Sequence, residues 1–508
     1  MFPQVFNKFQ PILAGIDFRL DRLENAYIND QVNLIESLYF FMVTNLLSLR
    51  RQPTIDANLR EYGEDGHTLN WITEAKAFQA ETRRAQYVKE MGDRVAFLHK
   101  QTKPVYGTLS PGCQVCGQGD WSCLFINGKC NCRCFYCPTV QNDFSVPTTN
   151  RIAFKRPGDY AAYVDRFNFG GVSISGGEPL LTVDRSLKYL NAVRRTVGDH
   201  IHLWLYTNGT RLTADHVSAL KDAGLNEIRF DISAADYDLS KIALAAGHIP
   251  HITVEIPAIP EDQARLLSLI PMMGDMGVNY LNLHQLRLTP FNHVHLKKRP
   301  YTFLHGEKVT VLESELTALS ILQTAAEKKW AFNINYCSFV YKHRYQRAAA
   351  RRRNAAFMVK GHESITENGF IRILSLAGDA RILQEACEMM NGKGVDKTRF
   401  TLSGKKDRLY FHGTLWPYLG NVRADLLVSY AEAQLTPAVS YYHPFKEISL
   451  PTGFKIVIER VLRLQDSKVS VEEQKCLDID PNTEMPVHSL NNDMDFYEYI
   501  HPGLQDYF

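Results

Sequence analysis

Three cysteines in the run Cys130-Asn-Cys-Arg-Cys134-Phe-Tyr-Cys137-Pro are spaced Cys-x3-Cys-x2-Cys. Three thiolates on one short loop can hold three irons of a [4Fe–4S] cube and leave the fourth iron open. An open iron can bind a substrate or a cofactor, whereas a cube with four protein ligands usually only transfers electrons. The spacing therefore predicts an iron–sulfur site with a chemical role at Cys130, Cys134 and Cys137.

A second motif follows one strand later. The apolar run that starts at Val172 leads into Gly176-Gly177-Glu178-Pro179. Glycines lack a Cβ, so the backbone can approach a ligand closely, and a neighbouring carboxylate can bind an ammonium group through a charge-assisted hydrogen bond. An ordinary strand-to-helix turn is the alternative, but the position after the cysteine loop favours a ligand site.

Together with Tyr136, which directly precedes the third cysteine, these motifs resemble the radical S-adenosylmethionine superfamily. The resemblance implies a [4Fe–4S] cluster whose open iron chelates the amino and carboxylate groups of S-adenosylmethionine, with Glu178 near the amino group. It also implies reductive cleavage to methionine and a 5′-deoxyadenosyl radical, which abstracts a hydrogen atom from a substrate. Such a reaction needs an electron donor such as flavodoxin or ferredoxin.

Short apolar runs rich in β-branched or aromatic residues recur at the spacing of βα units. They lie at Ser122–Ile126, Val172–Gly176, Ile201–Tyr206, Glu227–Ile232, Ile252–Ile256 and Tyr280–Leu286. Helical patterns separate them, and the one at Ala214–Ala223 ends at Gly224, a helix C-cap residue. The alternation predicts an α/β fold with a parallel sheet. Six units are too few for a full barrel, and the resemblance implies a partial (β/α)6 TIM-type barrel.

Parallel barrels place their chemistry at the carboxyl ends of the strands, where several polar residues of this chain lie. Glu255 on the fifth strand is either an outward charge or a ligand, and His284, beside Gln285 on the sixth, is either a barrel histidine or a substrate contact. The segment Val254–Pro257 resembles the strand that lines the adenine. The resemblance assigns cofactor contacts to Tyr136, Gly176, Gly177, Glu178, Asn208, Arg229, Asp231 and Ser233.

Further cysteines surround the cluster motif. A Cys-x2-Cys pair such as Cys113 and Cys116 is a common half-site for zinc or iron, although a redox dithiol or two free thiols are alternatives. This pair, the cluster motif, a distant Tyr-Cys337-Ser and a following arginine-rich helix resemble an uncharacterised group related to the pyruvate formate-lyase activating enzyme. We expect a second metal site from Cys113, Cys116 and Cys337, completed by Cys123 or Cys132. Thiolates suit an iron–sulfur cluster, iron or zinc equally.

The whole chain has 508 residues, of which 45% are hydrophobic and 22% charged, and this composition is typical of a soluble globular protein. A net charge of +2 gives no global attraction to nucleic acid or membrane. The amino terminus lacks a secretory pattern, and the apolar stretch Leu38–Leu49 is too short to span a bilayer. Abundant thiols without a signal sequence predict a reducing, cytoplasmic setting. Cys387 and Cys476 are expected to be ordinary thiols.

The length favours several domains. We expect a helical N-terminal region at 1–105, the barrel at 106–335, a Cys/Arg-rich segment at 336–360 and a small α/β module at 361–508. In the module, strands are predicted at Gly369–Leu376, Leu409–Gly413, Val439–Tyr442 and Lys455–Leu462, with a helix at Arg381–Asn391.

The basic stretch Lys342–Arg353 is the strongest concentration of charge. It could bind RNA phosphates, bind an acidic peptide, form a solvated face, or support the second metal site. Three functions follow: a radical enzyme acting on a peptide or protein, which includes glycyl-radical activation; a radical enzyme modifying RNA or a nucleotide; and a non-catalytic electron carrier. The flanking regions and the second metal site favour the first, and the Gly-Gly-Glu-Pro turn argues against the third.

Overall fold

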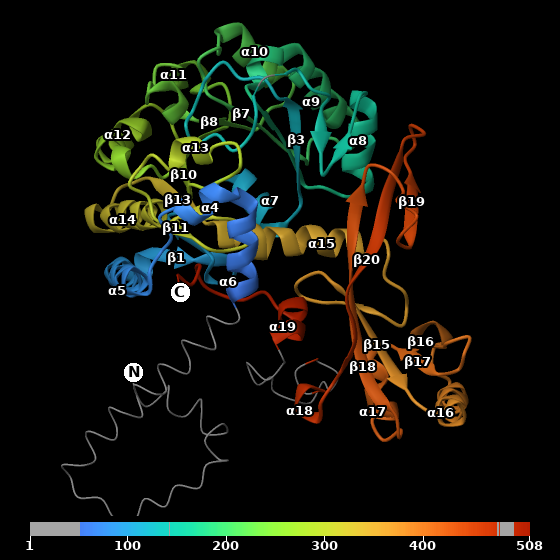
Figure 1. Cartoon of the computed structure of the whole chain (residues 1–508). Coiled ribbons are helices and arrows are strands. Elements are labelled where there is room, and N and C mark those ends of the chain that lie inside the picture. Colours follow the sequence, from blue (N-terminus) through green and yellow to red (C-terminus); the bar gives the residue numbers. More distant parts are fainter. Residues whose placement is uncertain (1–50, 142, 475–476, 478–491, 508) are drawn as a thin grey trace, which may run out of the picture.

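The computed structural model describes residues 51–141, 143–474, 477 and 492–507. Two sheets organise this part of the chain, one of eleven strands and one of seven, and Figure 1 shows the larger one with its helices above the smaller one. The predicted N-terminal helices within 1–50, including Leu38–Leu49, and Cys476 lie outside the described residues. Among the described residues, no helix has both the length and the hydropathy of a membrane span.

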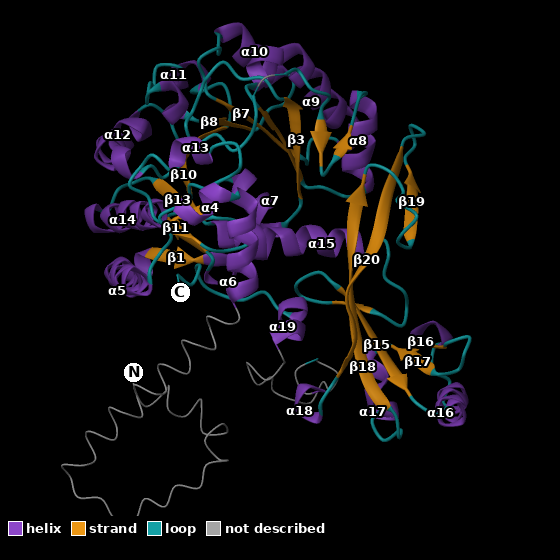
Figure 2. Ribbon diagram, viewed as in Figure 1, coloured by secondary structure: helices purple, strands orange, loops and turns teal. Residues whose placement is uncertain are grey.

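Seven parallel strands form the centre of the larger sheet (Figure 2). They are β3 (Trp121–Asn127), β6 (Gly171–Gly176), β7 (His202–Thr207), β8 (Glu227–Phe230), β9 (His251–Pro257), β10 (Tyr280–His284) and β13 (Asn333–Cys337). The first six are the predicted strands, so the α/β partial barrel is confirmed. The seventh, β13, pairs in parallel with β10 and places Cys337 opposite His284. Antiparallel strands extend both edges: β1 (Val95–Phe97), β2 (Lys103–Tyr106), β4 (Thr148–Thr149) and β5 (Ile152–Ala153).

Helices cover the outside of this sheet. They are α8 (Pro157–Arg166), α9 (Val183–Val197), α10 (Ala214–Asp222), α11 (Ile242–Ala245), α12 (Gln263–Asp275) and α14 (Leu312–Lys328), with α4 (Glu64–Thr68), α5 (Glu74–Met91), α6 (Leu98–Gln101), α7 (Pro111–Gln118) and α13 (His293–Leu296) elsewhere around the barrel. Ala223 is the C-cap of α10, and the predicted cap residue Gly224 follows it with a φ of +75° and donates its amide to the Lys221 carbonyl at 2.8 Å.

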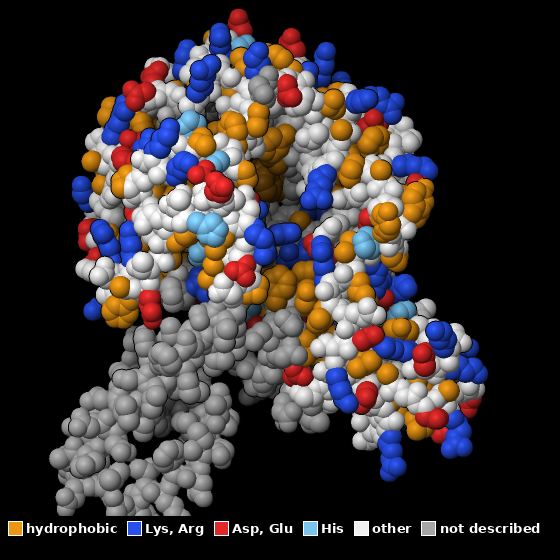
Figure 3. All heavy atoms as spheres, viewed as in Figure 1, with side chains coloured by type: hydrophobic (Ala, Val, Ile, Leu, Met, Phe, Trp, Pro, Cys, Tyr) orange, Lys and Arg blue, Asp and Glu red, His pale blue; other side chains and the backbone are white. Residues whose placement is uncertain are grey.

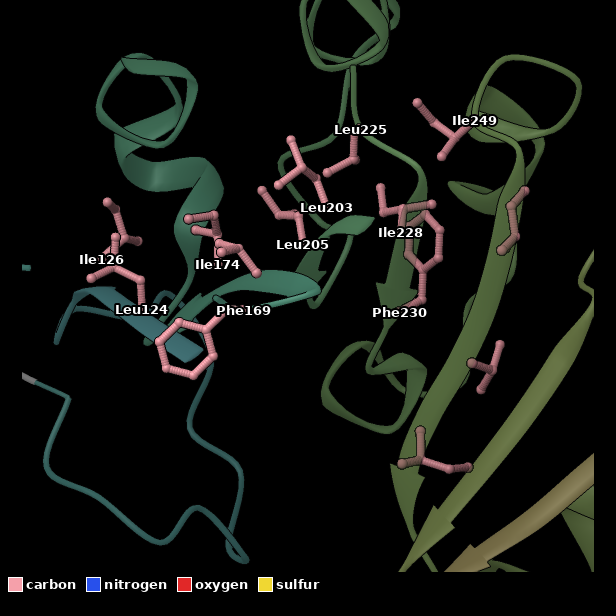
Figure 4. Packing of buried hydrophobic residues seen from close by; sticks show 14 of the residues in the cluster. Leu124, Ile126, Phe169, Ile174, Leu203, Leu205, Leu225, Ile228, Phe230 and Ile249 are labelled. Atoms are coloured by element: carbon pink, nitrogen blue, oxygen red, sulfur yellow. The ribbon is translucent and has the colours of Figure 1, made fainter. Parts of the chain in front are cut away.

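Alternation along each strand separates the core from the barrel interior. On β7, Leu203 and Leu205 are fully buried and pack with Ile174 and Ile228 in the hydrophobic layer between strands and helices (Figure 4). Tyr206 lies between them and the strand end, and its side chain lines an interior cavity. The same apolar periodicity that builds the core therefore directs polar and aromatic residues to the inside.

The C-terminal module is an antiparallel sheet. Its strands are β14 (Ser364–Ile365), β15 (Ile371–Ala377), β16 (Phe400–Leu402), β17 (Arg408–Phe411), β18 (Asp425–Thr436), β19 (Phe445–Ser449) and β20 (Lys455–Lys468). The helices of this part of the chain are α16 (Ala380–Gly392), α17 (Trp416–Leu419), α18 (Val471–Gln474) and α19 (Asn492–Glu498). A separate two-stranded ribbon of β11 (Phe303–Leu304) and β12 (Thr310–Val311) lies beside the barrel. The predicted strand at Val439–Tyr442 is wrong, because these residues form a loop in which Tyr441 has a φ of +62°. Ala433 and Ile458 belong to the same core cluster as the barrel.

The basic stretch connects the two sheets (Figure 1). A π-helical turn at Tyr341–Gln346 runs into α15 (Arg347–Ala355). The buried Arg351 guanidinium donates to the Asn368 carbonyl at 2.7 Å, and Arg353 contacts the Phe169 ring at 4.4 Å and pairs with Asp120 at 2.5 Å. Much of this positive charge is therefore used inside the protein, which favours the structural interpretation of the stretch.

Candidate active site

The cysteine loop (residues 128–138) follows β3 and is held by the Gly-Gly-Glu turn after β6. The amide of Gly177 donates to the Asn127 carbonyl at 2.9 Å, and the amide of Glu178 donates to the Lys129 carbonyl at 2.8 Å. A Cβ on Gly177 would overlap the Lys129 carbonyl oxygen. Gly177 is required because the turn after β6 touches the cysteine loop there. The sequence prediction instead explains the glycines by the close approach of a ligand.

Donors surround the sulfur atoms of the loop. Cys130 Sγ accepts from the Cys132 amide at 3.4 Å and from Asn208 Nδ2 at 3.7 Å, and Cys137 Sγ accepts from Gln141 Nε2 at 2.7 Å. Hydrogen bonds from Cys132 lower the pKa of the Cys130 thiol to about 6. N–H donors of this kind stabilise thiolates and tune an iron–sulfur cluster.

The three cysteines fit a [4Fe–4S] cube. Burial is the largest cause of the raised pKa of the Cys134 thiol, about 12, and the charges of Cys130 and Cys137 also raise it. All three cysteines line the same cavity. In the described part of the chain, no three His, Cys, Asp or Glu side chains surround a single ion, but a cube spreads its three thiolates over three irons.

Glu178 is almost fully buried beside this loop. Its Oε1 accepts from the Leu180 amide at 2.9 Å and from the Thr207 hydroxyl at 2.8 Å, and its Oε2 accepts from the Asn208 amide at 2.8 Å. Burial raises the pKa of the Glu178 carboxyl to about 7 despite these donors. The bonds orient the carboxylate rigidly at the wall of the cavity, next to Cys130.

Tyr136, Asp231 and Ser233 form one hydrogen-bonded group. The Tyr136 hydroxyl lies 3.1 Å from Asp231 Oδ2 and 2.7 Å from Ser233 Oγ, and Ser233 Oγ donates to Asp231 Oδ1 at 2.6 Å. Burial raises the pKa of the Asp231 carboxyl. The aromatic residue of the cluster motif is thus fixed to the end of β8, 95 positions away in sequence.

A cavity of about 560 Å³ opens at the carboxyl ends of the strands. Figure 3 shows a hollow at the centre of this face, walled by hydrophobic side chains, with Lys and Arg at its rim. The predicted residues that line the cavity are Cys130, Cys134, Cys137, Tyr136, Gly176, Gly177, Glu178, Asn208 and Asp231. Their assignment to the cofactor stays a prediction. Sequence reasoning missed Gln141 and Thr207, and it named Lys342 only as part of the basic stretch and not as a cavity residue. For Thr207 the Tyr-Thr-Asn-Gly strand end was an available signal.

Arg229 does not line this cavity. Its guanidinium pairs with Glu227 at 2.8 Å and with Glu255 at 2.6 Å, and the ring of Trp204 lies 5.2 Å away. This network occupies the barrel interior, so the placement does not support the predicted cofactor contact of Arg229. Glu255 lines the cavity and is not an outward charge. His284 also lines it, and burial lowers the pKa of its imidazole to about 3.

The second group of cysteines comes from α7 and from the end of β13. Helix α7 starts with the Ser110 side chain accepting from the Cys113 amide at 3.1 Å and places Cys113 and Cys116 three residues apart, on one face. Cys337 ends β13, and both Cys337 and Cys113 raise the pKa of Cys116, after burial itself. The charges of these three thiols interact, but in the described part of the chain no three such side chains are grouped to hold one ion. The second metal site stays a prediction.

A buried lysine accompanies them. Lys103 is 1% exposed, and its Nζ lies 4.6 Å from the Tyr341 ring centroid. Within the described residues its ammonium group forms no ion pair or hydrogen bond. Burial lowers the pKa of this group, but the charges of Cys337, Cys113 and Cys116 outweigh that effect and raise the pKa. A buried ammonium is costly unless an anion compensates it, and three thiolates on a metal would supply that charge.

The two candidates for a fourth ligand lie in different places. Cys132 is hydrogen-bonded to Cys130 and belongs to the cysteine loop, so this placement does not support a role of Cys132 in the second site. Cys123 lies on β3 and lines a cavity together with Cys116. Cys387 is a half-buried free thiol on α16.

Comparison with known proteins agrees with this geometry. Residues 124–283 match the family model described as the Radical SAM superfamily. A Methanocaldococcus jannaschii protein named "Putative glycyl-radical enzyme activating enzyme" is 28% identical over 59% of this chain and 82% of its own length. A GTP 3′,8-cyclase of Campylobacter jejuni is 30% identical over 32% of this chain and 48% of its own length.

Among solved structures, Streptococcus suis SuiB bound to S-adenosylmethionine aligns over 61% of this chain and 68% of its own, with 12% identity and a TM-score of 0.33. A TM-score of this size supports no inference about function. The family match and the cysteine-loop geometry do not depend on it. Residues 124–283 thus form a region that matches the radical SAM superfamily.

Proposed function

We propose that this radical SAM enzyme abstracts a hydrogen atom from a peptide or protein. The observation that carries this proposal is the match to the Methanocaldococcus jannaschii relative over 82% of that protein's length, because its name describes an enzyme that acts on another enzyme. The match to GTP 3′,8-cyclase covers only about half of that protein. A nucleotide or RNA substrate is therefore the alternative.

In this proposal the cavity residues have distinct tasks. Cys130, Cys134 and Cys137 hold the [4Fe–4S] cluster, and Asn208 donates to the Cys130 sulfur. Glu178 faces the amino group of S-adenosylmethionine, and the Tyr136–Asp231 bond fixes the outer part of the loop. When bound there, the reduced cluster supplies the electron that cleaves S-adenosylmethionine to methionine and a 5′-deoxyadenosyl radical. The protein orients the reactants and excludes water.

We also propose a second metal centre held by Cys113, Cys116 and Cys337. Lys103 compensates its negative charge, and Cys123 is the better placed of the two predicted fourth ligands. Cys337 lies opposite His284 in the parallel pair of β10 and β13, and His284 lines the cofactor cavity. A centre at this position adjoins the site of radical formation.

The RNA alternative rests on Lys342–Arg353, and the structure supplies other partners for part of this charge. Removing Arg353 leaves Asp120 and the Gly119 carbonyl without their donor, which we expect to cost about 1–3 kcal/mol of unfolding free energy. If RNA is the substrate, R353Q should in addition lose RNA retention under conditions in which the variant is still folded.

Deuterium transfer tests the substrate class. The reduced holoenzyme is incubated with the protein fraction and, separately, the RNA fraction of its source organism grown on deuterated nutrients, and 5′-deoxyadenosine is examined by mass spectrometry. Deuterium acquired from the protein fraction supports the proposal. Deuterium acquired from the RNA fraction alone contradicts it and supports the alternative.

A further inference from the structure

A second cavity, of about 600 Å³, lies between the barrel and the C-terminal sheet. One wall comes from β3 and the β4–β5 hairpin, another from α15, and a third from residues 432–435 of β18. Trp121, Cys123, Phe125 and Lys342 line this cavity and also the cofactor cavity. A ligand in the second cavity would therefore reach the wall of the site where the radical forms.

The charge of this cavity is positive. Its acid, Glu432, is paired with Arg463 at 2.6 Å, and its buried Arg351 is bonded to Asn368. The side chains of Arg151 and Lys342 form no hydrogen bond or ion pair with any residue that the structure describes, and the Lys342 ammonium lies 5.3 Å from the Phe339 ring centroid. Two cations without an anionic protein partner in one cavity favour a ligand that carries carboxylates or phosphates.

The walls also offer apolar area. Trp121, Tyr163 and Phe169 line the cavity, and Phe125 is 43% exposed although it is a large hydrophobic residue. Aromatic side chains beside cations suit a ligand that has both apolar and anionic groups. A peptide segment with mixed side chains has both.

One cavity wall is an edge of β18 that α15 contacts and that no described strand pairs with beyond Ala431. Strand β18 pairs with β20 along residues 430–436, but on its other side β15 pairs with it only as far as Ala431. On the open side the Ala433 carbonyl accepts from Asn354 Nδ2 at 3.3 Å, and no described strand pairs beyond it. An extended peptide can add to such an edge through its backbone.

We propose that this cavity binds the substrate as an extended, carboxylate-bearing peptide segment, held by Arg151 and Lys342 beside residues 433–435 of β18. This inference rests on the proposed function and names the substrate class for the same site. Lys342 occupies the boundary of the two cavities, so it fixes the anionic segment next to the residue that is to lose a hydrogen atom.

Fluorescence anisotropy with labelled hexaglutamate tests the site on the reconstituted holoenzyme. We expect binding that R151Q and K342Q each weaken about tenfold, the loss of one charge-assisted contact. The matched control R381Q, on the 86% exposed Arg381 of α16, should bind as the wild type does. Absent binding, or equal binding by R151Q and K342Q, overturns the proposal.

Two further measurements place the ligand. Amide hydrogen exchange at residues 433–436 should slow when hexaglutamate is bound, and unchanged exchange there contradicts strand addition. Hexauridylate is tested in the same way. If it binds more tightly than hexaglutamate and its binding depends on Arg151 and Lys342, the cavity binds nucleic acid and the peptide proposal is wrong. Formation of 5′-deoxyadenosine by the wild type reports the proposed function separately, because it requires no occupant of this cavity.

Discussion

The side-chain amide of Asn208 lies 3.7 Å from Cys130 Sγ, although 78 residues separate the two. The backbone amide of Asn208 donates to Glu178 at 2.8 Å, so one residue connects the carboxylate of the Gly-Gly-Glu turn with the first cysteine of the motif. Substituting Asn208 by Ala removes the donor to sulfur and leaves the backbone bond in place.

We expect N208A to lose about 10- to 100-fold in cluster affinity or activity, as is typical when a partner of a metal ligand is removed. Iron content and 5′-deoxyadenosine yield after anaerobic reconstitution measure both. The control N391A changes an exposed residue of α16. Equal iron and equal product in N208A and N391A would show that the bond has no role.

Gly177 provides a test of the contact between the two loops. A Cβ at this position overlaps the Lys129 carbonyl oxygen, whereas a Cβ on Gly392 meets nothing within 4 Å. We therefore expect G177A to displace the cysteine loop and lose iron, while G392A retains it. Iron analysis with thermal unfolding separates loop displacement from global unfolding. A G177A protein with normal iron content would contradict the geometry.

Lys103 reports on the second metal centre. If Cys113, Cys116 and Cys337 hold a metal as thiolates, K103M removes the compensating cation and should weaken metal retention about 10- to 100-fold. Metal is measured in a background that lacks Cys130, Cys134 and Cys137, with K89M on the surface of α5 as control.

The opposite result is informative too. Without an anionic group beside it, Lys103 is an unpaired buried charge, and K103M would then raise the unfolding temperature. That outcome, with no metal bound in either protein, contradicts the second centre.

His305 makes stability depend on pH. Its ring stacks on Trp71 with centroids 3.8 Å apart, and burial lowers the pKa of its imidazole to about 4. The folded state thus binds fewer protons than the unfolded state between pH 6.5 and 4, so stability falls as the pH falls through this window. H305Q should give a shallower decline in urea unfolding, and the exposed-site control H200Q should not. Equal slopes in H305Q and the wild type would exclude this cause.

The repeated strands and the cluster motif could be predicted because both depend on local patterns. Runs such as Ile201–Tyr206 alternate between core and interior, and the three thiols lie within one loop. The role of Arg229 was not predictable, because its pairing with Glu227 and Glu255 depends on which way three strands direct their side chains. Val439–Tyr442 has strand-forming residues, yet it forms the connection between the end of β18 and the start of β19.

The separation of Cys132 from the second cysteine group likewise required the fold. Spacing alone permits Cys132 to join Cys113 and Cys116, but the close contact of Gly177 with Lys129 fixes the cysteine loop beside the Gly-Gly-Glu turn that follows β6. The second cavity was also beyond sequence reasoning, since its walls come from β3, α15 and β18.

The most direct measurement is 5′-deoxyadenosine formation by the anaerobically reconstituted, dithionite-reduced protein with S-adenosylmethionine. The comparison is a variant with Cys130, Cys134 and Cys137 changed to Ala, and C387A is the control thiol substitution. The account predicts product from the wild type and from C387A and none from the triple variant. Product from the triple variant, or none from a wild type with a reducible cluster in the presence of its protein fraction, would contradict it.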